Sequence, residues 1–288
     1  KDARINGVVF TGSTETAQAI NRSLAARQGA LIPFIAETGG INALVADSSA
    51  LPEQIVNDVM ASAFNSAGQR CSACRVLFVQ QEIADRVLHL LQSALGEWMI
   101  GDPAQLTTDI GPVIDADALE LLKNHQKKMR ELASKGEAKV VYEMPLPPGI
   151  EQGTFSAPCI YELKHFDQLE SEVFGPILHV IRFGANELEK VIASINAKGF
   201  GLTLGLHSRI DDHIEMVCAR AKVGNLYVNR NMIGAVVGVQ PFGGEGLSGT
   251  GPKAGGPHYL LRFATECTQT VNTAAVGGNA GLLAESDE

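Results

Sequence analysis

The 288-residue sequence has no apolar run of the roughly 18 residues that a membrane-spanning helix needs, and no signal peptide is visible. Charged residues make up only 19% of the chain, and the net charge is −9, which argues against intrinsic binding to nucleic acid or an anionic membrane. The five cysteines are odd in number and lack the spacing of a disulfide framework, which indicates a reducing compartment. These absences favour a cytoplasmic enzyme, or part of one, with one large domain or two smaller ones.

Short apolar segments alternate with amphipathic segments along the chain, which is typical of an α/β fold. A strand at 7–10, a helix carrying Ala17, Ile20 and Leu24, and a strand at 31–36 form a βαβ unit that implies parallel pairing, with Gly29 as the helix C-cap. Further strands are expected at 42–46, 75–79, 155–161, 177–183, 201–207 and 225–228. Further helices are expected around 55–63, 83–98, 115–134, 187–197 and 212–222. The pattern predicts a parallel-rich sheet flanked by helices.

The strongest candidate for chemistry is the stretch Phe-Asn-Ser-Ala-Gly-Gln-Arg-Cys-Ser-Ala-Cys at 64–74, between an amphipathic helix and an apolar strand. Small residues around Cys71 leave room for a ligand close to the sulfur. Backbone N–H groups of the turn, together with Arg70, would favour the thiolate. Cys71 is therefore a candidate nucleophile, although most unpaired cysteines are small core residues.

The spacing Cys71-x-x-Cys74 also permits a redox pair or half of a zinc site. No second cysteine pair and no His-x₃₋₅-His follows, so no metal site is expected. The flanking segments do not supply the βαβ setting of a thioredoxin-like pair. A Cys71–Cys74 redox switch stays open as an alternative.

Other polar candidates stand at the ends of apolar segments. Gly12 and Ser13 open a helix, where backbone amides can hold a phosphate, although serine also caps ordinary helices. Glu37 leaves an apolar strand just before two glycines, a position that a solvated turn residue could equally occupy. Glu172 and Phe174 precede a Gly-Pro turn and could bind hydroxyls and stack on a ring, or belong to an ordinary loop.

Five motifs in this order resemble the aldehyde dehydrogenase superfamily: Phe-Thr-Gly-Ser-Thr-Glu, Glu-Thr-Gly-Gly, Gly-Gln-Arg-Cys, Glu-Val-Phe-Gly-Pro and Pro-Phe-Gly-Gly. The resemblance covers nearly all of residues 8–273. The glycine-rich stretch at 231–257 is similar to a narrower group, the Δ1-pyrroline-5-carboxylate (glutamate-semialdehyde) dehydrogenase module of bifunctional bacterial proline-utilization (PutA) proteins. It implies oxidation of L-glutamate γ-semialdehyde to L-glutamate with NAD⁺, the second step of proline catabolism.

The resemblance also implies roles for individual residues. Cys71 takes the position of the nucleophile and Glu37 that of the general base, and Cys74 is then structural. Cofactor contacts are implied for Gly12, Ser13, Glu172 and Phe174. Contacts with the carboxylate end of the substrate are implied for Ser72, Gly234, Ala235 and Phe242.

Two departures from the family pattern stand out. Ile41 replaces a lysine found in many members, and no effect on the chemistry is expected. The family's earlier Rossmann strands, oxyanion-hole asparagine and adenosine-ribose contacts are not found, so the chain is expected to be truncated at its start and to bind NAD weakly. The expected segments are a remnant of the NAD-binding domain at 1–38, a catalytic domain at 39–244, and a C-terminal return and oligomerisation segment at 245–288 with a mobile tail from 277.

For the full-length parent, the resemblance implies an FAD-dependent proline dehydrogenase domain on the same chain, channelling between the two activities, and a homo-oligomer. It also implies a cytoplasmic location with peripheral association at the inner membrane. Two alternatives remain: another semialdehyde dehydrogenase, and a non-catalytic module used for assembly or channelling.

Overall fold

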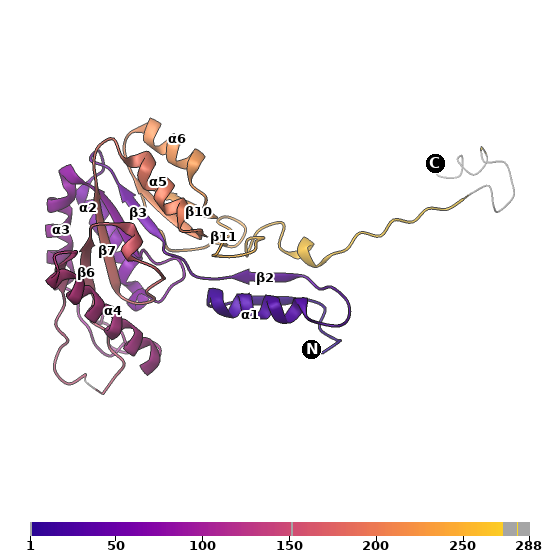
Figure 1. Ribbon diagram of the computed structural model, residues 1–288, viewed down its shortest axis with the longest axis horizontal. Coiled ribbons are helices and arrows are strands. Elements are labelled where there is room, and N and C mark those ends of the chain that lie inside the picture. The colour runs from indigo at the N-terminus through magenta and orange to yellow at the C-terminus, as the bar shows by residue number, and fades with distance from the viewer. Residues whose placement is uncertain (1, 151, 273–280, 282–288) are drawn as a thin grey trace.

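The apolar segments build a seven-stranded sheet in the computed structural model, which describes residues 2–150, 152–272 and 281 (Figure 1). The strand order is β10-β9-β3-β4-β7-β6-β5. These strands are β3 (Ala43–Ala46), β4 (Val76–Gln80), β5 (Ala138–Glu143), β6 (Cys159–Leu163), β7 (Ile177–Phe183), β9 (Thr203–His207) and β10 (Asn225–Val228). Every neighbouring pair is parallel except β5 with β6, so the predicted α/β fold with a parallel-rich sheet is confirmed.

Five helices accompany this sheet in the described part of the chain: α2 (Pro52–Phe64), α3 (Gln81–Gly96), α4 (Ala116–Ser134), α5 (Leu188–Ala197) and α6 (Asp211–Arg220). Every residue of β3, β4 and β9 is buried, as expected for parallel strands covered on both faces. Helix α2 begins with Pro52 at its first turn and buries Ile55, Val59 and Ala63. Its C-terminal end at Phe64 is where the chain turns toward Cys71.

The N-terminal residues form a separate βαβ unit that projects from the main body (Figure 1). Strand β1 (Val8–Thr11) pairs in parallel with β2 (Phe34–Glu37), and α1 (Thr14–Ala25) connects them. The glycine-rich C-terminal segment returns to this unit. It pairs β11 (Glu245–Gly246) with β8 (Phe200–Gly201) in an antiparallel bridge and runs on alongside β2.

Several expected boundaries differ from the structure. Strand β5 was not predicted, because its half-exposed sequence lacks a clear apolar run, and the strand expected at 155–161 lies instead at β6. Helix α1 ends at Ala25 with Ala26 as its C-cap, so Gly29 is not the cap. The tail expected from 277 lies outside the described residues except for residue 281. Among the described residues, no helix is long and apolar enough to cross a membrane.

Candidate active site

Cys71 lies on a strained connection between α2 and β4. After α2, a 3₁₀ turn at Asn65–Gly68 places Ser66 and Ala67 in the left-handed region, with φ of 57° and 51°. Non-glycine residues there cost free energy and persist only where their surroundings hold them. Gly68 follows at φ 65°, and a side chain at this position would overlap the carbonyl of Gly175. The turn is therefore fixed by close backbone contact as well as by local sequence.

A buried amide holds the Cys71 turn from the opposite side. Asn42 donates from Nδ2 to the carbonyl oxygens of Cys71 at 2.6 Å and Ala73 at 3.0 Å, and its Oδ1 accepts from the backbone N–H of Thr203 at 3.2 Å. If the turn moved, these hydrogen bonds would break and leave buried polar groups unpaired, which costs free energy. Asn42 therefore holds the backbone of the Cys71 turn in one orientation.

The surroundings of the thiol combine opposing effects. Burial raises the pKa of Cys71, and the nearby carboxylate of Glu172 raises it further, whereas hydrogen bonds from backbone N–H groups and the charge of Arg75 lower it. Part of the sequence-based expectation was wrong here. Arg70 is exposed and donates to Ser66 Oγ at 3.0 Å, and the cation that favours the thiolate is Arg75.

Cys74 is fully buried and donates to the Val76 carbonyl at 3.4 Å. Burial raises the pKa of Cys74 to about 12. A thiol in this state is a poor nucleophile and a poor partner in thiol–disulfide exchange, so its surroundings favour a structural role over that of a redox partner.

Glu37 ends β2 in a partly desolvated position. Its Oε2 accepts from the backbone N–H of Gly244 at 2.9 Å, and its Oε1 is buried without a hydrogen-bond partner among the described residues. Burial raises the pKa of Glu37 to about 7, although the Gly244 N–H and the charge of Lys253 lower it. A carboxyl group with a pKa near neutrality suits a general base.

The glycine-rich segment lies against this carboxylate. A Cβ added to Gly243 would lie 2.6 Å from Glu37 Oε1, and one added to Gly249 would lie 2.9 Å from Oε2. These two positions therefore need glycine because the backbone approaches the carboxylate closely. The high glycine content of this segment is therefore explained in part by its close contact with Glu37.

Glu172 and Phe174 meet a side chain that sequence analysis did not single out. Arg75 donates from Nε and Nη2 to Glu172 Oε1 at 3.2 and 3.0 Å, and its guanidinium carbon lies 4.9 Å from the centroid of the Phe174 ring. Burial raises the pKa of Glu172, partly offset by Arg75. Gly39 is needed beside this pair, since an added Cβ would overlap Glu172 Oε2.

The expected phosphate contacts lie at the start of α1. Ser13 is the helix N-cap, and its hydroxyl accepts from the Thr16 N–H at 3.2 Å. The Gly12 N–H donates to the Glu37 carbonyl at 3.1 Å. Both groups already have partners within the protein, and their assignment to the cofactor stays a prediction.

Among the residues expected to hold the substrate carboxylate, Ser72 adjoins Cys71 and Gly234 is connected to its surroundings through Tyr227. The Tyr227 hydroxyl donates to the Gly234 carbonyl at 3.1 Å. Burial raises the pKa of Tyr227, the charge of Arg230 lowers it, and a charge on Cys71 raises it further. Ser72 is buried beside Cys71. Gly234 has φ 109°, and within the described ranges the N–H groups of Gly234 and Ala235 donate to no acceptor. Phe242 pairs its backbone with Ala254 further along the same segment.

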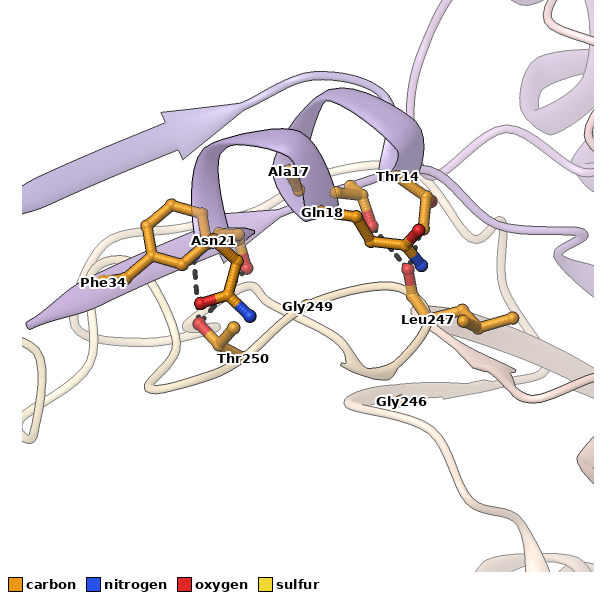
Figure 2. A pocket seen from close by; sticks show the side chains of 11 residues that line it. Thr14, Ala17, Gln18, Asn21, Phe34, Gly246, Leu247, Gly249 and Thr250 are labelled. Carbon is orange, nitrogen blue, oxygen red and sulfur yellow. Dashed lines mark hydrogen bonds between the residues drawn. The ribbon is translucent and has the colours of Figure 1, made fainter. Parts of the chain in front are cut away.

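A separate cavity of about 190 Å³ lies between α1, β2 and the loop at 246–250 (Figure 2). Thr14 Oγ1 and Thr38 Oγ1 donate to the Leu247 carbonyl at 3.2 and 2.6 Å, which joins the loop to α1 and β2. Its lining includes none of Cys71, Glu37 and Glu172, so it is distinct from the thiol site.

The sequence singled out Cys71, the two carboxylates and the glycine-rich segment, and their roles stay predictions. It did not single out Asn42, Arg75, Tyr227 and Lys253, which the structure places around them. One signal was available: Arg75 is a charged residue at the start of an otherwise apolar strand sequence. Such a residue is rarely buried without a partner.

Residues 1–270 match the Aldehyde dehydrogenase family. The chain is 57% identical over 276 residues to the bifunctional protein PutA of Klebsiella aerogenes, a match that covers 93% of this chain and 21% of that protein. A crystal structure of bifunctional proline utilization A matches with a TM-score of 0.89 and 59% identity, over 96% of this chain and 27% of the other. A 1-pyrroline-5-carboxylate dehydrogenase from Thermus with bound NAD matches with a TM-score of 0.82 and 32% identity, over 91% and 50%.

The chain thus spans about a fifth of the bifunctional PutA relative and half of the Thermus enzyme. The match extends from the βαβ unit through the Cys71 turn to the glycine-rich segment, in the order in which the motifs occur. The chain belongs to the aldehyde dehydrogenase family.

Proposed function

We propose that this chain carries the nucleophile and general base of an NAD-dependent dehydrogenase that oxidises L-glutamate γ-semialdehyde to L-glutamate. The observation that carries the proposal is the state of the Glu37 carboxyl group, whose pKa burial raises to about 7, in a chain that also presents the Cys71 thiol on a turn held by Asn42. The relatives named for PutA and for 1-pyrroline-5-carboxylate dehydrogenase support the choice of substrate.

In the first step, the Cys71 thiolate attacks the aldehyde carbon. A C–S bond forms, and the electron pair of the C=O bond moves to oxygen, where the Cys71 backbone N–H can stabilise the negative charge. Since burial and Glu172 raise the pKa of the resting thiol, binding of the substrate has to favour the thiolate or coincide with proton loss. Oxidation of this adduct leaves a thioester on Cys71.

In the second step, Glu37 accepts a proton from water, and the hydroxide attacks the thioester carbon. The C–S bond then breaks, glutamate leaves and the Cys71 thiolate is restored. Oε1 of Glu37 is the group for this proton, because it is buried and has no partner among the described residues, while Oε2 is occupied by Gly244. The carboxyl group is poised because its pKa lies near neutrality.

The hydride acceptor for oxidation of the adduct would be supplied by bound NAD⁺. Glu172 and Phe174 fit a role in holding it: the Glu172 carboxylate lies against the backbone of Gly39, and the Phe174 ring is 44% exposed, so a planar group could pack against it. Ser13 and Gly12 would contribute the N-terminus of α1 to a phosphate. The chain's own contribution is to orient the carbonyl carbon between Cys71 and that ring.

The N–H groups of Gly234 and Ala235, together with Ser72 and Phe242, would hold the carboxylate end of the substrate. For the parent protein, we further propose an FAD-dependent proline dehydrogenase on the same chain, channelling to this site, and a homo-oligomer. The name of the bifunctional relatives supports a second activity on the parent chain.

The test is alkylation of each cysteine with iodoacetamide, followed by peptide mass spectrometry, with and without glutamate γ-semialdehyde. We expect the semialdehyde to slow labelling of Cys71 and to leave the exposed Cys218 unchanged. Glutarate semialdehyde (5-oxopentanoate), which has the same chain length and lacks only the amino group, serves as a matched control and should protect less. Equal labelling of Cys71 with and without either aldehyde would refute the proposal and favour a non-catalytic module. Equal protection by both would indicate another semialdehyde dehydrogenase.

A further inference from the structure

Arg75 is the largest fully buried side chain of the described residues, with 0% of its surface exposed. A buried guanidinium costs free energy unless its donors are satisfied by acceptors and its charge is paired. It stands directly before β4 and four residues after Cys71. The burial of Arg75 therefore depends on the groups that accept hydrogen bonds from its guanidinium.

One set of partners belongs to the turn that presents the nucleophile. Arg75 Nη1 donates to the Gly68 carbonyl at 2.6 Å, and Nη2 donates to the Arg70 carbonyl at 3.0 Å. These carbonyls lie on either side of Gln69, just before Cys71. The guanidinium thus holds the same turn that Asn42 holds through the Cys71 and Ala73 carbonyls.

The other set belongs to the loop between β6 and β7. Nε and Nη2 donate to Glu172 Oε1, Nη1 makes a longer bond of 3.4 Å to the Gly175 carbonyl, and the Phe174 ring packs over the guanidinium. One planar cation thereby joins two segments about a hundred residues apart in sequence.

The backbone of Arg75 is anchored as firmly as its side chain. Its N–H donates to the Asn42 carbonyl at 2.9 Å, and its carbonyl accepts from both the N–H and the Nδ1 of His179, each at 3.0 Å. The Cα of Arg75 therefore cannot shift to follow either segment if the other moves.

We propose that Arg75 is a positioning residue that holds the Cys71 turn and the carboxylate of Glu172 in one fixed arrangement. The part that concerns the cofactor rests on the proposed function, and the part that concerns Cys71 does not. Lysine could not take this role, because its ammonium presents three donors at one point, whereas the guanidinium reaches acceptors on several sides at once.

The experiment compares the pH dependence of Cys71 alkylation by iodoacetamide, relative to the exposed Cys218, in two matched pairs. The first pair is R75K against the original chain. The R75K substitution keeps the positive charge but removes the planar set of guanidinium N–H donors. The second is R75M/E172Q against E172Q, which avoids leaving a buried carboxylate unpaired.

We expect the midpoint of the Cys71 profile to rise by about one pH unit in R75K, so that labelling at neutral pH falls about tenfold, and to rise similarly in R75M/E172Q against E172Q. The cause is that a loosened turn no longer aims its backbone N–H groups at the sulfur. If R75K kept the original profile, Arg75 would act only through its charge and the inference would be overturned.

Labelling of the buried Cys74 and Cys159 reports whether a variant is folded. If R75M/E172Q exposes them, R75K alone decides the question. This pH profile is measured without cofactor or substrate. An absence of protection by glutamate γ-semialdehyde in the separate labelling test would therefore contradict the proposed function but would leave this inference standing.

Discussion

The raised pKa of Glu37 predicts that Glu37→Gln stabilises the protein at pH 8 but not at pH 4.5. The folded pKa of about 7 lies above the ordinary value of 4.5, so the folded state holds the proton more tightly than the unfolded chain. Below pH 4.5 the Glu37 carboxyl group is protonated in both the folded and the unfolded chain, so its ionisation does not lower the free energy of unfolding. Between pH 4.5 and 7 stability falls, and above about pH 7 the full cost of ionising Glu37 is present.

The size of this effect follows from the shift. At 1.36 kcal/mol per unit, a rise from 4.5 to about 7 corresponds to at most about 3.4 kcal/mol. Glu37 is only partly buried and solvent screens its charge, so we expect about 1–2 kcal/mol. Glutamine removes the titrating proton and keeps a carbonyl oxygen that can accept from the Gly244 N–H.

The assay is urea unfolding followed by tryptophan fluorescence. The single tryptophan, Trp98, packs edge-on against Phe64 with centroids 6.4 Å apart, so its emission reports loss of the core. The unfolding midpoints of the original chain and of E37Q should agree at pH 4.5 and separate above pH 7. The exposed Glu170→Gln is the matched control and should change the free energy of unfolding by less than about 0.5 kcal/mol at either pH.

A difference between E37Q and the original chain that did not depend on pH would refute the reasoning, since it would show that Glu37 is ionised without cost. In an active parent enzyme, the same substitution should lower the rate of thioester hydrolysis by about 10²–10⁴-fold, the usual contribution of a general base.

Three further predictions follow from buried contacts. Gly68→Ala should destabilise the chain by more than about 1 kcal/mol, because its Cβ would overlap the Gly175 carbonyl at a φ of 65°, and a lowered urea midpoint would show it. Asn42→Ala should cost about 1–3 kcal/mol and loosen the Cys71 turn, seen as faster amide hydrogen exchange there. Burial lowers the pKa of His179 to about 3 and that of His125 to about 4, so stability should fall as pH drops below 6.5, and less so in His125→Gln.

The tautomers of the last pair follow from the geometry. The carbonyl of Arg75 can only accept, so Nδ1 of His179 carries the proton, and Nε2 of neutral His179 must accept from His125 Nε2–H at 2.8 Å. Protonating His179 would place two N–H groups against each other. Because Glu37 acts in the opposite direction over this pH range, the comparison is made between variants. If the change in urea midpoint from pH 7 to pH 5 were the same in His125→Gln as in the original chain, this arrangement would be wrong.

The sequence by itself determined those features that depend on neighbours along the chain. Periodicity placed β7 at its observed bounds and α2 within three residues of its ends, and the motif around Cys71 predicted a helix-to-strand turn. It also placed Glu37 at the end of a strand. Helical and strand periods and turn chemistry act over a few residues, so they can be read locally.

Only the tertiary structure decided how these parts act on one another. Arg75 and Glu172 are 97 residues apart, and no local pattern links them. The desolvation that raises the pKa of Glu37 comes with Gly243 and Gly244, more than 200 residues away, packing against its carboxylate. Arg70, the nearest cation in sequence, points elsewhere because side-chain direction depends on the fold of the turn. Charge and burial are set by groups that only folding brings together, so the sequence predicted which residues react, and the structure determined the burial and the partners of their side chains.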